Sequence, residues 1–131
     1  MSTDMSMDGR IAIWPSIPVG MLPADSRHNP ANHQGSPAAI LVDLVFDIET
    51  DAIGRQFVTG LVPAVTFERK LGNPCAEIEH LIHEYGQGCT FSGTLRVHSR
   101  EDGTSEIVVE DGRVEWTDWK PAPPASPAPQ H

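Results

Sequence analysis

The chain has 131 residues, of which 39% are hydrophobic and 21% charged, and this predicts one folded domain with its own core. A formal net charge of −9 argues against a classical basic nucleic-acid binder, although a local basic stripe stays compatible with nucleic acid. No apolar run approaches the roughly 18 residues of a membrane span, and no signal-peptide pattern opens the chain. With two cysteines only, too few for a disulfide scaffold, we expect a cytoplasmic protein that does not contact membranes.

Both ends of the chain have compositions typical of disordered segments. Residues 1–8 are small, polar and acidic, whereas residues 121–131 hold five of the twelve prolines and no formal charge. A proline-rich segment without side chains that can pack populates extended polyproline II. We therefore expect disorder over 1–8 and 121–131 and a domain over 9–120, and the tail is either inert or a tether for a protein partner.

The N-terminal half predicts strands separated by one long loop. Isoleucines of one parity predict a strand over 10–17, in which Pro15 indicates an edge strand or a bulge. Residues 19–37 are rich in Pro, Asn, His and Gly and predict a functional loop or lid. Alternating apolar residues over 40–49 predict a half-buried second strand, and 50–55 predict a hairpin loop.

A third strand and the one helix follow. Residues 56–68 predict a strand with a bend at Gly60 and Pro63. Asn73 followed by Pro74 is a helix start, since Asn is a favoured N-cap and proline a favoured first helical residue. A single apolar stripe then runs through the predicted helix to Tyr85: Ile78, Leu81, Ile82 and Tyr85.

The C-terminal part predicts three more strands. Residues 89–99 alternate cleanly, residues 105–109 follow a turn at 101–103, and residues 113–116 form a short last strand. The order β-β-β-α-β-β with an optional last strand describes a mainly β protein. We expect the five-stranded oligonucleotide/oligosaccharide-binding (OB) barrel with one helix between strands three and four. A generic α+β sandwich is the alternative.

The middle of the chain carries a family resemblance. Residues 65–70 (VTFERK), the helix 76–85, and the stretch from Gly86 to Gly93-Thr94-Leu95-Arg96 resemble the central part of bacterial and phage single-stranded DNA-binding proteins. The match covers roughly residues 56–115. It implies an OB fold and single-stranded DNA binding in phage, plasmid or bacterial DNA replication. Among the family's base-stacking positions only Phe67 is aromatic, because Leu61 and Arg100 stand at the others.

A DNA site on a sheet needs aromatic faces for base stacking together with cations for phosphates. The aromatic and basic residues of the predicted strands and hairpins supply both. The tryptophans at positions 14 and 119 are further candidates. The predicted nucleic-acid-binding residues are Arg55, Phe57, Phe67, Arg69, Lys70, Arg96, His98, Arg100 and Trp116. For the aromatic residues, a place in the core is the alternative.

Zinc and catalytic sites have weaker support. Cys75, His80, His83 and Cys89 contain zinc-ligand residue types but not a standard spacing, and His28 and His33 are isolated in the long loop. Asp43 and Asp47 are four residues apart on one strand face, about 13 Å, which is too far for a shared metal ion or a retaining carboxylate pair. Their expected role is to keep that face of the strand exposed to solvent. With no catalytic motif present, we expect no enzyme and no cofactor.

Two functions remain open on the sequence alone. The leading hypothesis is a non-enzymatic single-stranded DNA-binding protein. The alternative is an OB-fold module for protein interaction or assembly, which the −9 charge and the missing stacking residues favour. Pro15 in the first strand predicts an open sheet edge, so we expect a homodimer or homotetramer.

Overall fold

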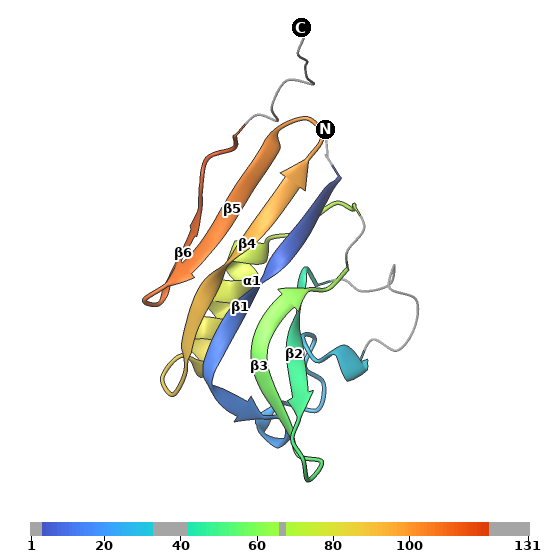
Figure 1. Cartoon of the computed structure of the whole chain (residues 1–131), viewed down its shortest axis with the longest axis vertical. Helices are drawn as coiled ribbons and strands as arrows, with labels where there is room; N and C mark the ends of the chain where they lie inside the picture. The colour runs from blue at the N-terminus through green and yellow to red at the C-terminus, as the bar shows by residue number, and fades with distance from the viewer. Residues whose placement is uncertain (1–3, 33–41, 66–67, 121–131) are drawn as a thin grey trace, which may run out of the picture.

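The computed structural model describes residues 4–32, 42–65 and 68–120, and every structural statement below concerns these residues. They form one antiparallel sheet and one helix (Figure 1). The six strands have the order β2-β3-β1-β4-β5-β6, and the sheet is not closed into a barrel. The strands are β1 (Met5–Pro18), β2 (Leu44–Thr50), β3 (Gln56–Pro63), β4 (Thr90–Ser99), β5 (Gly103–Glu110) and β6 (Arg113–Trp116); the helix is α1 (Pro74–Tyr85).

The mainly β domain with one helix between its third and fourth strands is therefore confirmed. The five-stranded OB-like barrel is not confirmed, because six strands form an open sheet whose edges are β2 and β6. Two short 3-10 turns, Val19–Met21 and Pro30–Asn32, occupy the described part of the predicted long loop. The proline-rich segment 121–131 and residues 33–41 lie outside the described residues.

The first strand is an interior strand, contrary to the prediction of an edge. β1 pairs with β3 on one side and with β4 on the other. The pairing with β3 shifts register between Ala12 and Ile17, around the cis bond before Pro15, so the predicted bulge is present. β1 also begins at Met5, and Met7 is buried, so residues 5–8 belong to the sheet and not to a disordered end.

The two faces of the sheet differ in character. On one face α1 lies across the sheet, and Ile78 and Leu81 of the helix join buried side chains of the strands such as Ile11, Phe46 and Leu95 in one core (Figure 1). Burial of such side chains supplies the main stabilisation of the fold. We call the sheet face turned away from α1 the open face. It carries the alternate, mostly polar positions of the strands.

The helix begins and ends where the sequence predicts. Asn73 is the N-cap, and its side-chain oxygen accepts a hydrogen bond from the Ala76 backbone N–H at 3.0 Å. Pro74 occupies the first helical position, where a missing N–H costs nothing. At the other end Gly86 follows Tyr85 as the C-cap. These local signals do not depend on the rest of the fold, which is why they could be recognised in the sequence.

Candidate functional site

A groove lies at the end of β1, between that strand and the turn that joins β2 to β3. Pro18 is the last residue of β1 and pairs with Phe57 of β3. The turn is held by the Asp51 carboxylate, which accepts hydrogen bonds from the backbone N–H groups of Ile53 and Arg55 at 3.1 and 2.8 Å. It also forms an ion pair with the Arg55 side chain at 2.8 Å. This network fixes one wall of the groove.

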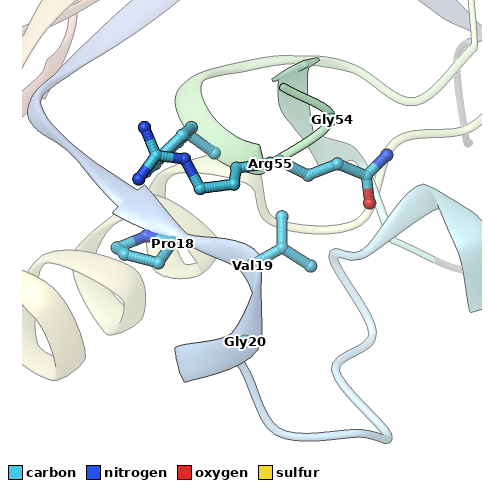
Figure 2. A pocket seen from close by; sticks show the side chains of 7 residues that line it. Pro18, Val19, Gly20, Gly54 and Arg55 are labelled. Atoms are coloured by element: carbon cyan, nitrogen blue, oxygen red, sulfur yellow. The ribbon is translucent and has the colours of Figure 1, made fainter. Parts of the chain in front are cut away.

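The groove has a volume of about 470 Å³ and is lined mainly by apolar groups. Figure 2 shows Gly54 and Arg55 on the turn side and Pro18, Val19 and Gly20 on the β1 side. The guanidinium carbon of Arg55 lies 5.9 Å from the centre of the Phe57 ring, so the cation covers the aromatic face. We call this feature the end groove, defined by Pro18, Val19, Gly20, Gly54, Arg55, Gln56 and Phe57.

Two large apolar side chains are exposed next to the lining residues in the chain. Met21, directly after Gly20, is 71% exposed, and Ile53, directly before Gly54, is 73% exposed. Isolated exposed apolar residues are common on soluble proteins. Here they accompany an apolar hollow, and such a combination is typical of interaction surfaces.

Of the predicted nucleic-acid-binding residues, the structure brings only Arg55 and Phe57 together in this groove. Arg69 is only 18% exposed in its side chain and donates to the Val42 carbonyl and to the Asp43 carboxylate. Arg100 forms an ion pair with Glu68 at 2.9 Å. The arginines therefore do not converge on one surface. Lys70 is exposed in the segment between β3 and α1, and Phe67 lies outside the described residues.

The remaining predicted residues lie on opposite faces of the sheet. Arg96 and His98 of β4 are on the open face, where His98 contacts the Asp8 carboxylate at 2.7 Å. Trp116 pairs in register with Ile107 and packs against the core on the helix-covered face. Its ring lies 6.1 Å from that of Trp119. A nucleic-acid surface that uses both Arg96 and Trp116 would have to span two faces.

A second cavity lies on the open face across β4, β5 and the segment after β6. It has a volume of about 310 Å³, and three basic side chains, Arg96, His98 and Lys120, line it together with Glu106 and Asp118. Among the described residues, Arg96 and Lys120 have no ion-pair partner within 4.0 Å. This cavity has the polar character that the end groove lacks.

A buried polar cluster, which the sequence analysis missed, connects β2 to α1. The Asp43 side chain is 1% exposed, and one of its oxygens accepts hydrogen bonds from Arg69 and from the Gly72 N–H at 3.3 and 3.0 Å. Glu77 of α1 accepts the backbone N–H groups of Asp43 and Leu44 at 2.9 and 3.2 Å. The expectation that Asp43 faces water is therefore wrong, because Arg69 compensates its buried charge.

The carboxyl of Glu77 holds its proton more tightly than an exposed glutamate. Burial, followed by contact with the Asp43 carboxylate, raises the pKa of Glu77 from 4.5 to about 7. His28 faces the same carboxyl at 3.7 Å, and its Nδ1 lies 2.9 Å from the Leu44 carbonyl oxygen. Burial lowers the pKa of His28. A neutral His28 therefore donates its Nδ1 proton to that carbonyl. The cluster thus joins the loop before β2, the start of β2, and α1.

The zinc-ligand residue types do not form a metal site. No group of three or more His, Cys, Asp or Glu side chains in the described ranges is arranged to hold a metal ion. Cys89 donates to the Pro15 carbonyl at 3.2 Å, and His80 contacts Glu84 at 3.3 Å. His33 lies outside the described residues.

Comparison with known proteins yields no relative. No family model matches the sequence, and no curated protein or solved structure matches the chain. No described helix has the length and apolar character needed to cross a bilayer. The functional argument therefore depends on the geometry of the chain itself.

Proposed function

We propose that the protein is a non-enzymatic interaction module that holds an uncharged, extended segment of a protein partner in the end groove. The observation that carries this proposal is the groove itself: an apolar hollow of about 470 Å³, with exposed Met21 and Ile53 directly next in the chain to two of its lining residues. Apolar hollows with a few polar groups are the usual form of a binding site. Here Gln56 and the Arg55 guanidinium are the polar groups that can donate to backbone carbonyls.

The distribution of charge favours a protein partner over a phosphate backbone. Three arginines that the sequence analysis assigned to phosphates, Arg55, Arg69 and Arg100, are engaged by Asp51, Asp43 and Glu68. A phosphate would have to compete with a carboxylate already in place, on a chain of net charge −9. An uncharged peptide in the end groove requires none of these ion pairs to break.

The test uses a substitution that fills the groove without disturbing the fold. A Cβ at Gly20 meets no atom within 4 Å, and the backbone there suits an ordinary residue, so Gly20→Val adds a branched side chain at a position that lines the groove. Gly88 is equally open but lies after α1, which makes Gly88→Val the matched control. Peptides of 12 residues are selected from a random library on the immobilised wild-type protein, and binding is then measured by fluorescence anisotropy.

We expect selected peptides to be uncharged and to lose at least tenfold in affinity on Gly20→Val, with no change on Gly88→Val. Amide chemical shifts should move at Val19, Gly20 and Phe57 when such a peptide is added. If no selected peptide distinguishes Gly20→Val from wild type, the end groove is not the binding site and the proposal fails.

Single-stranded DNA binding by an OB-like homo-oligomer in the cytoplasm stays the second candidate, because Arg96 and Lys120 line the open-face cavity without ion-pair partners in the described chain. The assay is fluorescence anisotropy with a labelled dT oligomer of about 35 nucleotides at low salt. If DNA binds through this cavity, Arg96→Ala should weaken binding and reduce the salt dependence by about one phosphate contact. Absence of binding at 50 µM protein would remove this candidate.

A further inference from the structure

We propose that the occupant of the end groove is residues 121–131 of a second copy of this chain, so that copies assemble head to tail. The inference depends on the proposed function of the groove and names its partner. It starts from the chemistry of the segment, which is PAPPASPAPQH: five prolines, three alanines, and no acidic or basic residue other than a histidine.

The segment and the groove are chemically complementary. Proline spacing of the type P-x-x-P occurs from Pro121 to Pro124 and again from Pro124 to Pro127. Segments of this composition favour polyproline II, which loses little entropy on binding and leaves its carbonyls unbonded. The end groove offers the flat ring of Pro18, the Phe57 ring with the Arg55 guanidinium over one face, and donors in Arg55 and Gln56. Aromatic-lined grooves with such donors are what polyproline II ligands bind.

The position of Lys120 makes docking within one copy geometrically unfavourable. Lys120 pairs with Thr104, next to the β4–β5 turn where Ser99 pairs with Met5 at the start of β1. The end groove is lined by Pro18, the last residue of β1, and so lies at the other end of this strand; Figure 1 shows the course of β1 between its two ends. The thirteen residue-to-residue steps from Met5 to Pro18 cover about 43 Å at ~3.3 Å per residue. Eleven residues of polyproline II cover about 34 Å at ~3.1 Å per residue. With this rise per residue the segment falls short of the groove of its own copy, and we assign it to the groove of another.

Charge and symmetry give this assembly specific properties. The segment is uncharged, so its docking adds no ion pair, whereas the chains as wholes repel each other at a net charge of −9. Salt should therefore strengthen the association slightly, which is opposite to an electrostatic complex. Because the segment and the groove are different surfaces, the contact is heterologous and each added copy presents a new groove. The mass should rise with concentration without stopping at a dimer.

The experiment separates segment and groove onto two variants. One variant keeps residues 121–131 and carries Gly20→Val; the other ends at Lys120 and has an open groove. Sedimentation velocity between 5 and 500 µM should show that neither variant associates alone, that an equimolar mixture forms a 1:1 complex, and that wild-type chains form larger species. The control variant Gly88→Val, which keeps both the segment and an open groove, should associate into larger species as the wild-type chain does. A labelled peptide of residues 121–131 should bind the shortened chain and lose at least tenfold in affinity on Gly20→Val.

The outcomes distinguish this inference from the proposed function. If library peptides bind the end groove but peptide 121–131 does not, the head-to-tail inference is overturned and the function stands. If the wild-type mass stops at a dimer or tetramer and the chain ending at Lys120 gives the same mass, another surface makes the oligomer and the inference is overturned. If no peptide loses affinity on Gly20→Val, the proposed function and the head-to-tail inference both fail.

Discussion

Replacing Glu77 by Gln should remove much of the pH dependence of folding stability. The Glu77 carboxyl contacts the Asp43 carboxyl, whose second oxygen is buried without a hydrogen-bond partner. A protonated Glu77 can donate to that oxygen, and a glutamine amide can do the same at every pH. The cluster would then contain one carboxylate, Asp43, opposite one guanidinium, Arg69. An ionised Glu77 leaves this cluster with an excess negative charge.

The sign and size of this pH dependence of folding stability follow from the pKa of Glu77. A folded-state pKa of about 7 against 4.5 for an ordinary glutamate means that the folded chain binds the proton more tightly. The contribution of Glu77 to folding stability is therefore greatest below pH 4.5, falls as the pH rises through 7, and is constant above that. Linkage gives a loss of about 2 kcal/mol between pH 5.5 and 8.5, and about 3 kcal/mol over the whole range. The measurement should stay above pH 5.5, because the isoelectric point is about 4.9.

The assay is urea unfolding of wild type and Glu77→Gln at several pH values from 5.5 to 8.5, followed by tryptophan fluorescence. The difference between the two proteins is the informative quantity, because His28 of the same cluster, whose pKa is lowered by burial, is present in both. That difference should change by about 2 kcal/mol in favour of Glu77→Gln as the pH rises. Glu79→Gln, an exposed position on the same helix, is the control and should show no such trend. A difference that stays constant within about 0.5 kcal/mol would refute a protonated Glu77.

Three further substitutions or truncations test the rest of the fold, each by chemical unfolding. Asp43→Ala removes the buried acceptor of Arg69 and should lower the free energy of unfolding by about 3 kcal/mol. Asp47→Ala removes a surface ion pair with Arg10 and should lower it by about 1 kcal/mol or less. Equal losses would contradict the burial of Asp43. Gly93→Ala should destabilise by more than about 2 kcal/mol, because φ is +152° and the added Cβ meets the Arg10 carbonyl oxygen of β1, and Gly88→Ala should be close to neutral. Removal of residues 121–131 should leave stability at low protein concentration within about 0.5 kcal/mol; a clearly larger loss would show that the segment packs on its own domain.

The parts of the fold that were predictable are those specified by neighbours in the chain. The Asn73 cap, the apolar stripe of α1 and the alternation of β4 are local patterns, and each was located within one or two residues. The position of β1 in the sheet could not be predicted from such local patterns. Pro15 suggests an edge, but the strand is interior because β3 and β4 pair with its two sides, with paired residues 39 to 50 positions apart for β3 and 76 to 94 for β4. A bulge between Ala12 and Ile17 accommodates the proline.

The candidate site was predictable only in part, for the same reason. Arg55 and Phe57 were identified from their residue types, and they do line the end groove. The opposite wall, at Pro18 to Gly20, comes from a segment about 35 residues earlier whose position depends on the β1–β3 pairing. The burial of Asp43 likewise depends on Arg69, which is 26 residues later. A sequence shows which charges exist, but only the fold shows which of them are already paired.

That pairing decides which surfaces are left to bind a partner. The ion pairs of Arg55, Arg69 and Arg100 lie at turns and strand ends, and that of Arg10 joins the middle of β1 to the middle of β2, so these cations serve the fold of an acidic chain. The open face carries side chains of both charges, and the helix-covered face is filled by the core. Among the cavities of the described chain considered above, the end groove is therefore the one where an incoming group displaces water from apolar surface without breaking an ion pair. Association there should gain free energy from apolar burial alone. It should consequently tolerate high salt, and a binding equilibrium that weakens steeply with salt would point to the open-face cavity at Arg96 instead.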